Sequence, residues 1–497
     1  MRLPLTQEEA SVLDRVCAFL DREGLDSYIF GGYVRDALLG RSTRDIDIAV
    51  CGPALEVARR AAQALNGQYV PLDESRQIAR VVLTEGDPAE GRRWHLDFST
   101  IDDSIEKHLS QRDLTINAMA INTRELEQGT VPRVIDPLHG REDLQRGVIR
   151  QASDTAFEDC PVRLLRAVRL ATEHSFAIEE RTETAIRSRA HLITQVPGEA
   201  VREELCRLLS LSRAASHLYY LDRLGLLTAI FPELAATRDV EQPREHYWDV
   251  FQHSIETVAA FERLLRGVGN QEDAVLSEAP HIPSAAEHFE EEVSHGASRA
   301  VLAKLACLLH DIAKPQTKTV ERDGRVRFLG HTRQGADMAG DILQRLRFSK
   351  REIKTVQTVI ASHLRLWQMG GEGRPTRRAI YRFFRDCGDA SIDVIFVTLA
   401  DFLAARGPDL DLAEWKQHCE MMQYIWSEHE KELAVVPPEK LVDGHDLISI
   451  FHLEPGPRLG ELLEAVREAQ GVGEITTRDE ALAFVRRRLA ASEVSQT

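Results

Sequence analysis

Two aspartates in the run "RDIDIAV" have the residue types and the spacing of a metal site. Asp45 and Asp47 stand two residues apart, and on a β-strand such residues point to the same face. Ile46, Ile48 and Val50 would then pack on the opposite face. Neighbouring carboxylates repel each other unless a cation lies between them, and Mg²⁺ prefers oxygen ligands. The run therefore predicts either a magnesium site or an exposed edge strand whose acidic residues face water.

A third carboxylate, Asp97, lies inside another β-like run, "RWHLDFSTI". Together with Asp45 and Asp47 it would complete a catalytic site that holds two metal ions. The alternative is a solvated aspartate at the end of a strand.

Two glycines upstream of the aspartate pair predict a phosphate-binding turn. Gly31 and Gly32 end a β-like run and precede a helical pattern over residues 33–39. Without Cβ atoms the backbone can approach a ligand closely, and the N-terminus of the following helix offers free N–H groups. Arg35 adds a charged fork in the first turn. A Gly-Gly pair alone is more often a simple turn.

A second set of residues could hold a metal in the C-terminal half of the chain. Histidines and aspartates occur there in successive helical segments, and ligands that converge from different helices form a common metal site of helical bundles. A single such histidine is more often a buried core residue. The set consists of His253, His310, Asp311, His331, His363 and Asp401. The His…His-Asp…Asp order predicts one divalent metal of unidentified type, and the two remaining histidines could bring a second.

The composition of the chain limits the classes of protein to which it can belong. Its 497 residues predict three or four domains. Because no apolar run reaches the roughly 20 residues that span a bilayer, and the N-terminus has no signal-peptide pattern, we expect a cytoplasmic protein without a membrane partner. The seven scattered cysteines indicate reduced thiols. With a net charge of −17, an RNA partner requires a local basic patch. The oligomeric state does not follow from the sequence.

The elements that must position these residues change character near residue 150. Short β-like runs separated by Gly, Pro and Asp turns predict a small mixed sheet within residues 1–150. Helical periodicity then predicts a neck over residues 151–240, a metal-binding domain over 241–433 and a C-terminal helical tail over 434–497. The acidic, proline-interrupted stretch 267–298 predicts a mobile insertion between two helices. The fold class is α+β.

Several motifs occur in an order that resembles a known family. The runs "GGYVRDALLG", "DID", "QRDLTINAMA", "IDPLHGREDLQRGVIR" and "RLLRAVRLA" resemble the head and neck of class II template-independent nucleotidyltransferases. This family comprises bacterial poly(A) polymerases and tRNA CCA-adding enzymes of the DNA polymerase beta superfamily. The resemblance implies a polymerase-beta-like head in which Mg²⁺, held by Asp45 and Asp47, promotes attack of an RNA 3′-hydroxyl on CTP or ATP. The partner would be the 3′ end of tRNA or of another RNA.

The same resemblance assigns further residues to the nucleotide. The two glycines and Arg35 fit the triphosphate cradle, and Arg112, Asp113 and Asn117 lie where the family's second motif meets sugar and phosphates. Asp113 and Asn117 are four residues apart, so on a helix they would share one face, as a ribose-binding pair requires. Asp113 could also cap the N-terminus of that helix.

The base-reading motif departs from the family pattern. The family usually shows Glu-Asp-Pro-Leu-Arg, whose Asp and Arg face the base, whereas this chain has "EDCPVR". If Arg163 matches the family's arginine, Cys160 takes the position of the Asp, and Asp159 falls one residue early. A thiol is a poor hydrogen-bond acceptor. Either Asp159 swings in to join Arg163 and Arg166, or the base is read with one partner fewer, so addition of C, of A or of both stays open.

The histidine and aspartate set resembles the HD phosphohydrolase superfamily. Many class II nucleotidyltransferases carry an HD domain, some with phosphatase or 2′,3′-cyclic phosphodiesterase activity. The basic and aromatic run "RPTRRAIYRFFR", residues 374–385, suits stacking and phosphate contact with single-stranded RNA. The leading interpretation is CCA addition or repair with a possible HD side activity. The alternatives are a poly(A) polymerase and an HD phosphohydrolase with a relic nucleotide-binding head.

Overall fold

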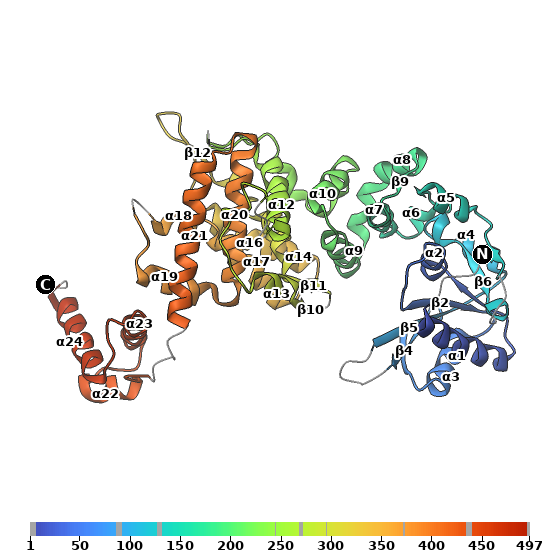
Figure 1. Ribbon diagram of the computed structural model, residues 1–497, viewed down its shortest axis with the longest axis horizontal. Coiled ribbons are helices and arrows are strands. Elements are labelled where there is room, and N and C mark those ends of the chain that lie inside the picture. Colours follow the sequence, from blue (N-terminus) through green and yellow to red (C-terminus); the bar gives the residue numbers. More distant parts are fainter. Residues whose placement is uncertain are drawn as a thin grey trace. The chain divides into compact units, whose positions relative to one another are not determined.

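The structure is a computed structural model that describes residues 6–85, 92–126, 132–243, 245–267, 272–294, 296–370, 373–433 and 440–494. Its contacts divide the chain into two units. The first comprises Met1–Leu208 and Leu221–Ile230, and the second comprises Leu209–Tyr220 and Phe231–Thr497. The strands of the main sheet lie in the first unit, and helices make up most of the second (Figure 1). The predicted α+β class is confirmed.

The first unit contains a mixed sheet in the order β3-β4-β5-β2-β1-β6-β7. The strand β2 pairs in parallel with β5, and the other neighbours are antiparallel. The strands are β1 (Ser27–Phe30), β2 (Asp45–Val50), β3 (Gln68–Asp73), β4 (Ile78–Glu85), β5 (Arg92–Thr100), β6 (Ala120–Asn122) and β7 (Val134–Ile135). The parallel pairing sets Asp47 level with Asp97 at the middle of the sheet.

Alternation along β2 explains why its aspartates face one side. Ile46, Ile48 and Val50 are completely buried, as predicted, while Asp45 is exposed. Helix α3 (Ala54–Ala64) packs on β4 and β5 (Figure 1). Helix α1 (Gln7–Glu23) begins with a capping box in which Thr6 and Glu9 satisfy each other's backbone N–H groups. The remaining elements before β7 are α2 (Gly32–Leu38), α4 (Ile105–Ser110) and the 3₁₀ turns η1 (Thr115–Asn117) and η2 (Thr123–Leu126).

The chain becomes mainly helical after β7. Between β7 and α11, a short parallel pair, β8 and β9, is the exception among the described residues, and it joins the turn after α5 to the turn after α7. The elements are α5 (Gly140–Arg146), β8 (Val148–Ile149), α6 (Ala156–Asp159), α7 (Arg163–His174), β9 (Ala177–Ile178), α8 (Glu180–Arg189), η3 (Ala190–Gln195), α9 (Gly198–Ser210), α10 (Ala214–Arg223) and α11 (Leu226–Ile230).

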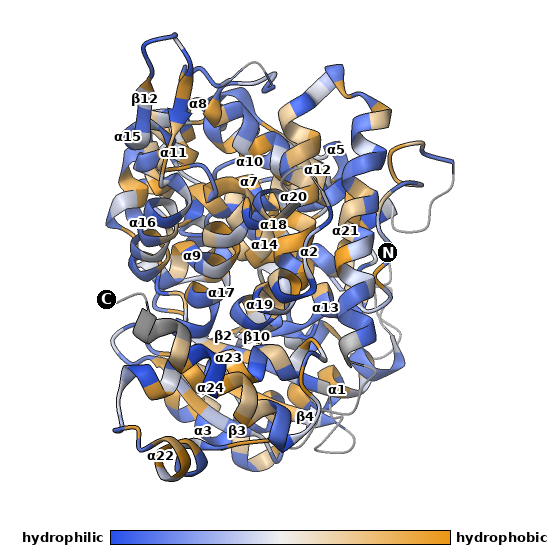
Figure 2. Ribbon diagram, turned by 90° about the vertical axis from the view of Figure 1, so that its left-hand side faces the viewer, coloured by the Kyte–Doolittle hydropathy of each residue, from blue (hydrophilic) through white to orange (hydrophobic). Residues whose placement is uncertain are grey.

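The second unit is built around α20 (Ser391–Arg406), which is buried along nearly its whole length. Its contacts include α12 (Val250–Gly267), α14 (Arg299–Leu309) and α17 (Lys350–Ser362), and Figure 2 colours much of α12 and α14 as hydrophobic. The other elements are η4 (Pro232–Thr237), α15 (Lys314–Thr317), β12 (Lys318–Val320), β13 (Val326–Phe328), α16 (His331–Arg345), α18 (Arg365–Gly370), α19 (Arg377–Cys387), η5 (Gly388–Ala390), η6 (Gly407–Asp409) and α21 (Leu412–Leu433).

The acidic stretch 267–298, predicted to be a mobile insertion, contains regular structure where it is described. It includes α13 (Ala285–Glu290) and β10 (Glu292–Ser294), which pairs with β11 (Ala297–Ser298). Val275 and Phe289 are buried, and the indole Nε1 of Trp415 donates to the Val275 carbonyl at 2.7 Å. Apolar anchors interspersed among the acidic residues therefore fix this segment, and composition alone concealed them.

The last part of the second unit has a hydrophobic cluster of its own. It contains α22 (Gly444–Phe451), α23 (Pro457–Gly471) and α24 (Arg478–Val494). Its buried members include Leu447, Val466 and Val485. Across the described parts of the whole chain, none of the helices is long and apolar enough to cross a membrane.

Candidate active site and metal centre

The two aspartates of β2 lie at the centre of a cluster of carboxylate side chains in the first unit. The Asp45 side chain is 72% exposed and the Asp47 side chain 35% exposed. Partial burial raises the pKa of Asp47, and the negative charges of Asp97 and Asp45 raise it further, while the nearby Arg112 opposes them. A carboxylate with a raised pKa among others of like charge is suited to binding a cation that can be reached from solvent.

Asp97 lies beside Asp47 as predicted, but it already has a cationic partner. Nε and Nη2 of Arg80 donate to its two oxygens at 2.7 and 2.8 Å. The two residues are cross-strand partners in the antiparallel β4–β5 pair. Arg80 was not predicted from the sequence. Its pairing with Asp97 depends on the register of β4 against β5, and no periodic pattern in the sequence indicates that register.

Gly31 creates the space that Asp47 occupies. Its φ is +74°, and a Cβ placed there would lie 2.6 Å from Oδ2 of Asp47. Gly32 begins α2, and a Cβ there would make only ordinary contacts, with the guanidinium of Arg35. The glycine pair is therefore a turn into a helix, as predicted, and the close approach it permits is to a side chain of the same site.

The guanidinium of Arg35 is not exposed to solvent, contrary to what the sequence-based assignment to a triphosphate would suggest. It is buried, and its Nε and Nη2 each donate to Asp36 at 2.9 Å, while Nη1 donates to Oδ1 of Asn117 at 2.7 Å. With three of its five N–H groups engaged in this way, Arg35 supports Asn117.

Asp113 and Asn117 are in contact, although the helix that was predicted to contain both is absent. The segment passes through extended backbone at Leu114 into the 3₁₀ turn η1, so the expected helix face was wrong. Nδ2 of Asn117 donates to Oδ1 of Asp113 at 3.1 Å, and that oxygen also accepts from the Leu114 N–H at 2.8 Å. Asp113 therefore does not cap a helix. Although burial opposes its ionisation, Arg166 and Arg112 lower the pKa of Asp113 to about 2.

The predicted arginines lie around these acids. Nη2 of Arg112 is 3.9 Å from Oδ2 of Asp47, and its guanidinium lies over the Phe30 ring. Nε of Arg166 donates to Glu204 at 3.0 Å, and its Nη1 reaches Oδ2 of Asp113 at 3.5 Å. Glu204 was missed by sequence reasoning and fixes Arg166 from helix α9.

The base-reading segment turns between α6 and α7. Arg163 donates to the carbonyls of Ala156 and Gln111 at 3.1 and 2.8 Å. Asp159 ends α6 and accepts from the Thr155 hydroxyl at 2.8 Å. Cys160 adopts extended backbone after it and lies near Arg166. The Asp159 side chain thus bonds a residue at the start of its own helix, and Cys160 is the residue that lies near Arg166.

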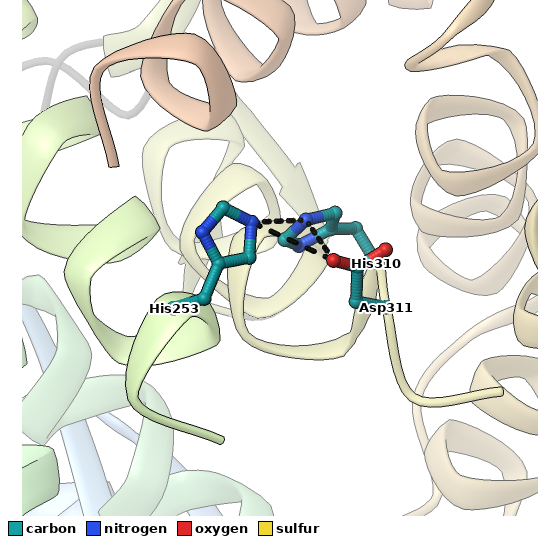
Figure 3. Close-up of side chains that lie close together, drawn as sticks. All are labelled: His253, His310 and Asp311. Atoms are coloured by element: carbon teal, nitrogen blue, oxygen red, sulfur yellow. Dashed lines mark hydrogen bonds and ion pairs between the residues drawn. The ribbon is translucent and has the colours of Figure 1, made fainter. Parts of the chain in front are cut away.

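The six predicted metal ligands of the second unit converge. They come from α12, the residues after α14, the start of α16, the end of α17 and α20. Figure 3 shows His253, His310 and Asp311 turned toward one another. Nε2 of His253 lies 3.2 Å from Nε2 of His310 and 2.9 Å from Oδ1 of Asp401. Three overlapping groups of three ligand atoms each fit around one metal ion.

Backbone carbonyls orient the imidazoles of this cluster. Nδ1 of His310, of His331 and of His363 each lies 2.6–2.8 Å from the carbonyl of the residue three positions earlier. A proton on Nδ1 leaves the lone pair of Nε2 free to bind a metal.

The charges of the cluster also fit a bound cation. Oδ1 of Asp311 and Nε2 of His331 are buried 3.4 Å apart, and neither makes a hydrogen bond among the described residues. Although burial lowers it, Asp311 and Asp401 raise the pKa of His310 to about 10, whereas burial lowers that of His363 to about 3. Buried orphan ligand atoms and two ionised carboxylates suit a divalent metal.

Two neighbours of the cluster were missed by sequence reasoning. Nζ of Lys314 lies 2.5 Å from Oδ2 of Asp311 and 2.6 Å from Oε1 of Gln242. The His246 ring contacts the His253 ring edge to face at 5.3 Å. Lys314 follows Asp311 by three residues, a spacing at which side chains on a helical turn are neighbours, and this spacing could have revealed the pair.

Three family models match the chain: the Poly A polymerase head domain over residues 27–150, the probable RNA and SrmB-binding site of polymerase A over 175–237, and the HD domain over 250–406. An A-adding tRNA nucleotidyltransferase of Deinococcus radiodurans is 34% identical over 92% of this chain and 94% of its own length. The chain belongs to the tRNA nucleotidyltransferase family. Its members are enzymes, so the family and enzyme class predicted from the motifs are confirmed.

Further similarities to this tRNA nucleotidyltransferase agree with that assignment. A CC-adding tRNA nucleotidyltransferase of Thermus thermophilus is 32% identical over 93% of both chains. A solved CCA-adding enzyme with ATP has a TM-score of 0.63 at 23% identity and covers 98% of this chain and 97% of its own. The Thermotoga maritima CCA-adding enzyme complexed with tRNA has a TM-score of 0.60 over the same shares. The solved structures therefore share its fold.

Proposed function

We propose that this tRNA nucleotidyltransferase is a partial enzyme, which adds only A or only C to the 3′ end of tRNA from ATP or CTP. The relatives from Deinococcus, Thermus, Geobacter and Synechocystis each match over at least 92% of this chain, and their names are A-adding or CC-adding enzyme. Multifunctional CCA proteins match over 46–70% of it.

The observation that supports nucleotidyl transfer itself is the alignment of Asp45 and Asp47 on β2 with Asp97 on β5, beside a glycine that leaves room for Asp47. Asp45 and Asp47 would hold Mg²⁺, and Asp97 would complete the carboxylate group if it releases Arg80. When bound, the metal would neutralise charge on the reacting phosphates and lower the pKa of the attacking hydroxyl.

The other residues of the site would position the nucleotide. Arg112, which lies beside Asp47 and near Gly31, would contact the phosphates together with the backbone of Gly31 and Gly32. The Asp113–Asn117 pair, which Arg35 fixes from behind, would bind the ribose. The Arg163 and Arg166 side of α7, with Cys160 or Asp159, would face the base.

Labelled tRNAs that lack all of CCA, lack only the last two residues or lack only the terminal A test this function. Incorporation of A into tRNA ending in CC, or of two C residues into tRNA lacking CCA, is expected, but not both. Asp45→Asn and Asp47→Asn should each reduce incorporation by a factor on the order of 10³. Asp103→Asn is the matched control, because Asp103 is exposed and paired with Lys107.

Two outcomes would contradict the proposal. Addition of complete CCA by the one protein would show a full CCA-adding enzyme, and untemplated long A tails would show a poly(A) polymerase. Unchanged incorporation by both aspartate variants would remove the assigned site.

We also propose that the histidine cluster binds a divalent metal and hydrolyses a phosphate ester. Its orphan atoms and its lysine-paired Asp311 support this second activity. Lys314 would be positioned to neutralise a substrate phosphate, and the metal when bound would supply an activated water.

Release of phosphate from nucleotides, and ring opening of a 2′,3′-cyclic nucleotide, test the second activity with Mn²⁺ present. His310→Ala and Asp311→Ala should abolish both metal retention, measured by elemental analysis, and hydrolysis. The exposed His281 offers a control, His281→Ala. Metal retention equal to that of the unaltered chain in both cluster variants would overturn the assignment.

A further inference from the structure

Helix α19 presents three arginines on the side opposite its buried face. Phe383 and Ile380 are buried against the rest of the second unit. Arg378, Arg382 and Arg385 follow one another at spacings of four and three residues, so they form one stripe along the helix. These are arginines of the basic and aromatic run that the sequence suggested for RNA contact.

Helix α23 and the turn after it cover this stripe with glutamates. Glu468 accepts from Nε and Nη2 of Arg382 at 2.6 and 2.7 Å and from Nη1 of Arg385 at 3.2 Å. Glu464 also pairs with Arg385, and Glu474 pairs with Arg378. Each arginine of the stripe is thus neutralised by a carboxylate from the C-terminal tail.

A further contact between the two helices lies at a glycine. A Cβ on Gly471 would lie 2.5 Å from Cε2 of Tyr381, which stands between the arginines. Gly460 lies in the same helix α23, and a Cβ there would meet nothing within 4 Å. The helix therefore offers one position where a side chain must displace either the Tyr381 ring or the helix itself, and one where a side chain has no such effect.

The tail depends little on α19 for its own fold. The apolar side chains of α23, such as Leu462 and Val466, pack into the cluster of residues 440–494. The ion pairs to α19 are open to water mainly on the arginine side: the Arg382 side chain is 49% exposed, whereas its partner Glu468 is 8% exposed. Glu474, the partner of Arg378, is 49% exposed. Exposed ion pairs contribute little individually and are screened by salt, so a polyanion can replace them.

We propose that the arginine stripe of α19 binds the phosphates of RNA and that α23 occupies it as an acidic competitor in the free protein. The guanidinium fork bonds carboxylates and phosphates in the same bidentate manner, so the glutamates stand in for phosphate oxygens. RNA gains further from the release of its counterions. Binding of RNA then frees the C-terminal tail. The choice of RNA as partner rests on the proposed function.

Binding of fluorescently labelled tRNA to the full chain, without nucleotide, tests the proposal. Gly471→Leu should bind RNA more tightly than Gly460→Leu, on the order of tenfold at low salt. Its slope of log K against log salt should steepen by about 2 to 3, as three added phosphate contacts require. Arg378→Gln, Arg382→Gln and Arg385→Gln together should reverse both changes in the Gly471→Leu background.

Small-angle scattering on the same proteins reports whether the tail has separated, as a larger radius of gyration. If Gly471→Leu fails to fold, the triple change of Glu464, Glu468 and Glu474 to Gln provides the second variant. Separation of the tail without tighter RNA binding would make the contact purely structural. A tail that stays docked in both variants would equally overturn the proposal. Failure of the unaltered chain to bind tRNA at all would instead contradict the proposed function.

Discussion

The two candidate sites differ in how much of their arrangement the protein supplies by itself. On the strand β2, the Asp45 side chain is exposed and the Asp47 side chain is partly exposed. Asp97 accepts hydrogen bonds from Arg80. His253, His310 and Asp311 are instead enclosed by helices and at most 1% exposed. On the proposed function, the open carboxylate site would be completed when nucleotide and metal bind, whereas the ligand atoms of the buried cluster already lie close together without the ion.

The largest effect should follow from closing the space beside Asp47. Gly31→Ala places a Cβ 2.6 Å from Oδ2 of Asp47 and should lower nucleotide incorporation by about 10²- to 10³-fold, because the metal-binding carboxylate must move. Gly388→Ala is a matched control, since Gly388 has a similar backbone conformation (φ +53°, ψ −128°, against +74° and −137° at Gly31) but nothing within 4 Å of its would-be Cβ. Equal losses in both variants, measured as kcat/KM, would attribute the effect to backbone strain alone.

A smaller effect should separate the two sites by their response to metal. Adding Mn²⁺ or Zn²⁺ to chelator-treated protein at 100 times Kd should stabilise the folded second unit by about 2.7 kcal/mol and raise its midpoint of thermal unfolding. The shift should disappear in His310→Ala and persist in Asp45→Asn. A shift that disappears only in Asp45→Asn would reverse the comparison.

The first unit should lose stability in mild acid through a histidine beside its site. Burial and the Arg112 guanidinium lower the pKa of His108 to about 4. Because the folded pKa is depressed, this stability is present above about pH 6.5 and is lost as the pH falls toward 4, by about 3 kcal/mol. His108→Phe, which keeps a ring against Phe30, should flatten the pH dependence of thermal unfolding in that range. His191→Gln, at an exposed histidine, should leave it unchanged.

The smallest effect concerns the choice of nucleotide. Cys160→Asp places a carboxylate beside Arg166 and should change the ratio of kcat/KM for ATP and CTP by up to about tenfold, since one hydrogen-bonding partner of the base is gained. Asp159→Asn should change the ratio by less than about twofold, because Asp159 faces Thr155. The opposite order of effects would identify Asp159 as the base-reading residue.

Short-range regularities predicted the parts of both sites that depend on them. Alternation along one strand was sufficient to place Asp45 and Asp47 on one face, and the chain order of His253, His310, Asp311 and Asp401 was sufficient to indicate a cluster. The fold class and the family followed from the same kind of local pattern.

Pairings between distant segments could not be predicted. The bidentate bond of Arg80 to Asp97 depends on strand register, and the engagement of Arg35 by Asn117 joins residues 82 positions apart. Asp113 and Asn117 were expected on a helix because their spacing fits one, yet hydrogen bonds across a 3₁₀ turn unite them. Similarly, the sequence suggested that the arginines of α19 contact RNA, but it gave no sign that the glutamates of α23 and of the turn after it pair with them.

The carbonyl bonds behind His310, His331 and His363 make the metal centre largely indifferent to the side chains that flank it. Each acceptor belongs to the backbone three residues earlier, at Cys307, Phe328 and Ile360. Replacing those side chains leaves the acceptors in place, whereas any distortion of the backbone there turns an imidazole away from the ion. If the cluster binds a metal as proposed, its affinity for that metal would depend on the backbone geometry of these three turns, and metal binding would respond to any distortion of the helical domain.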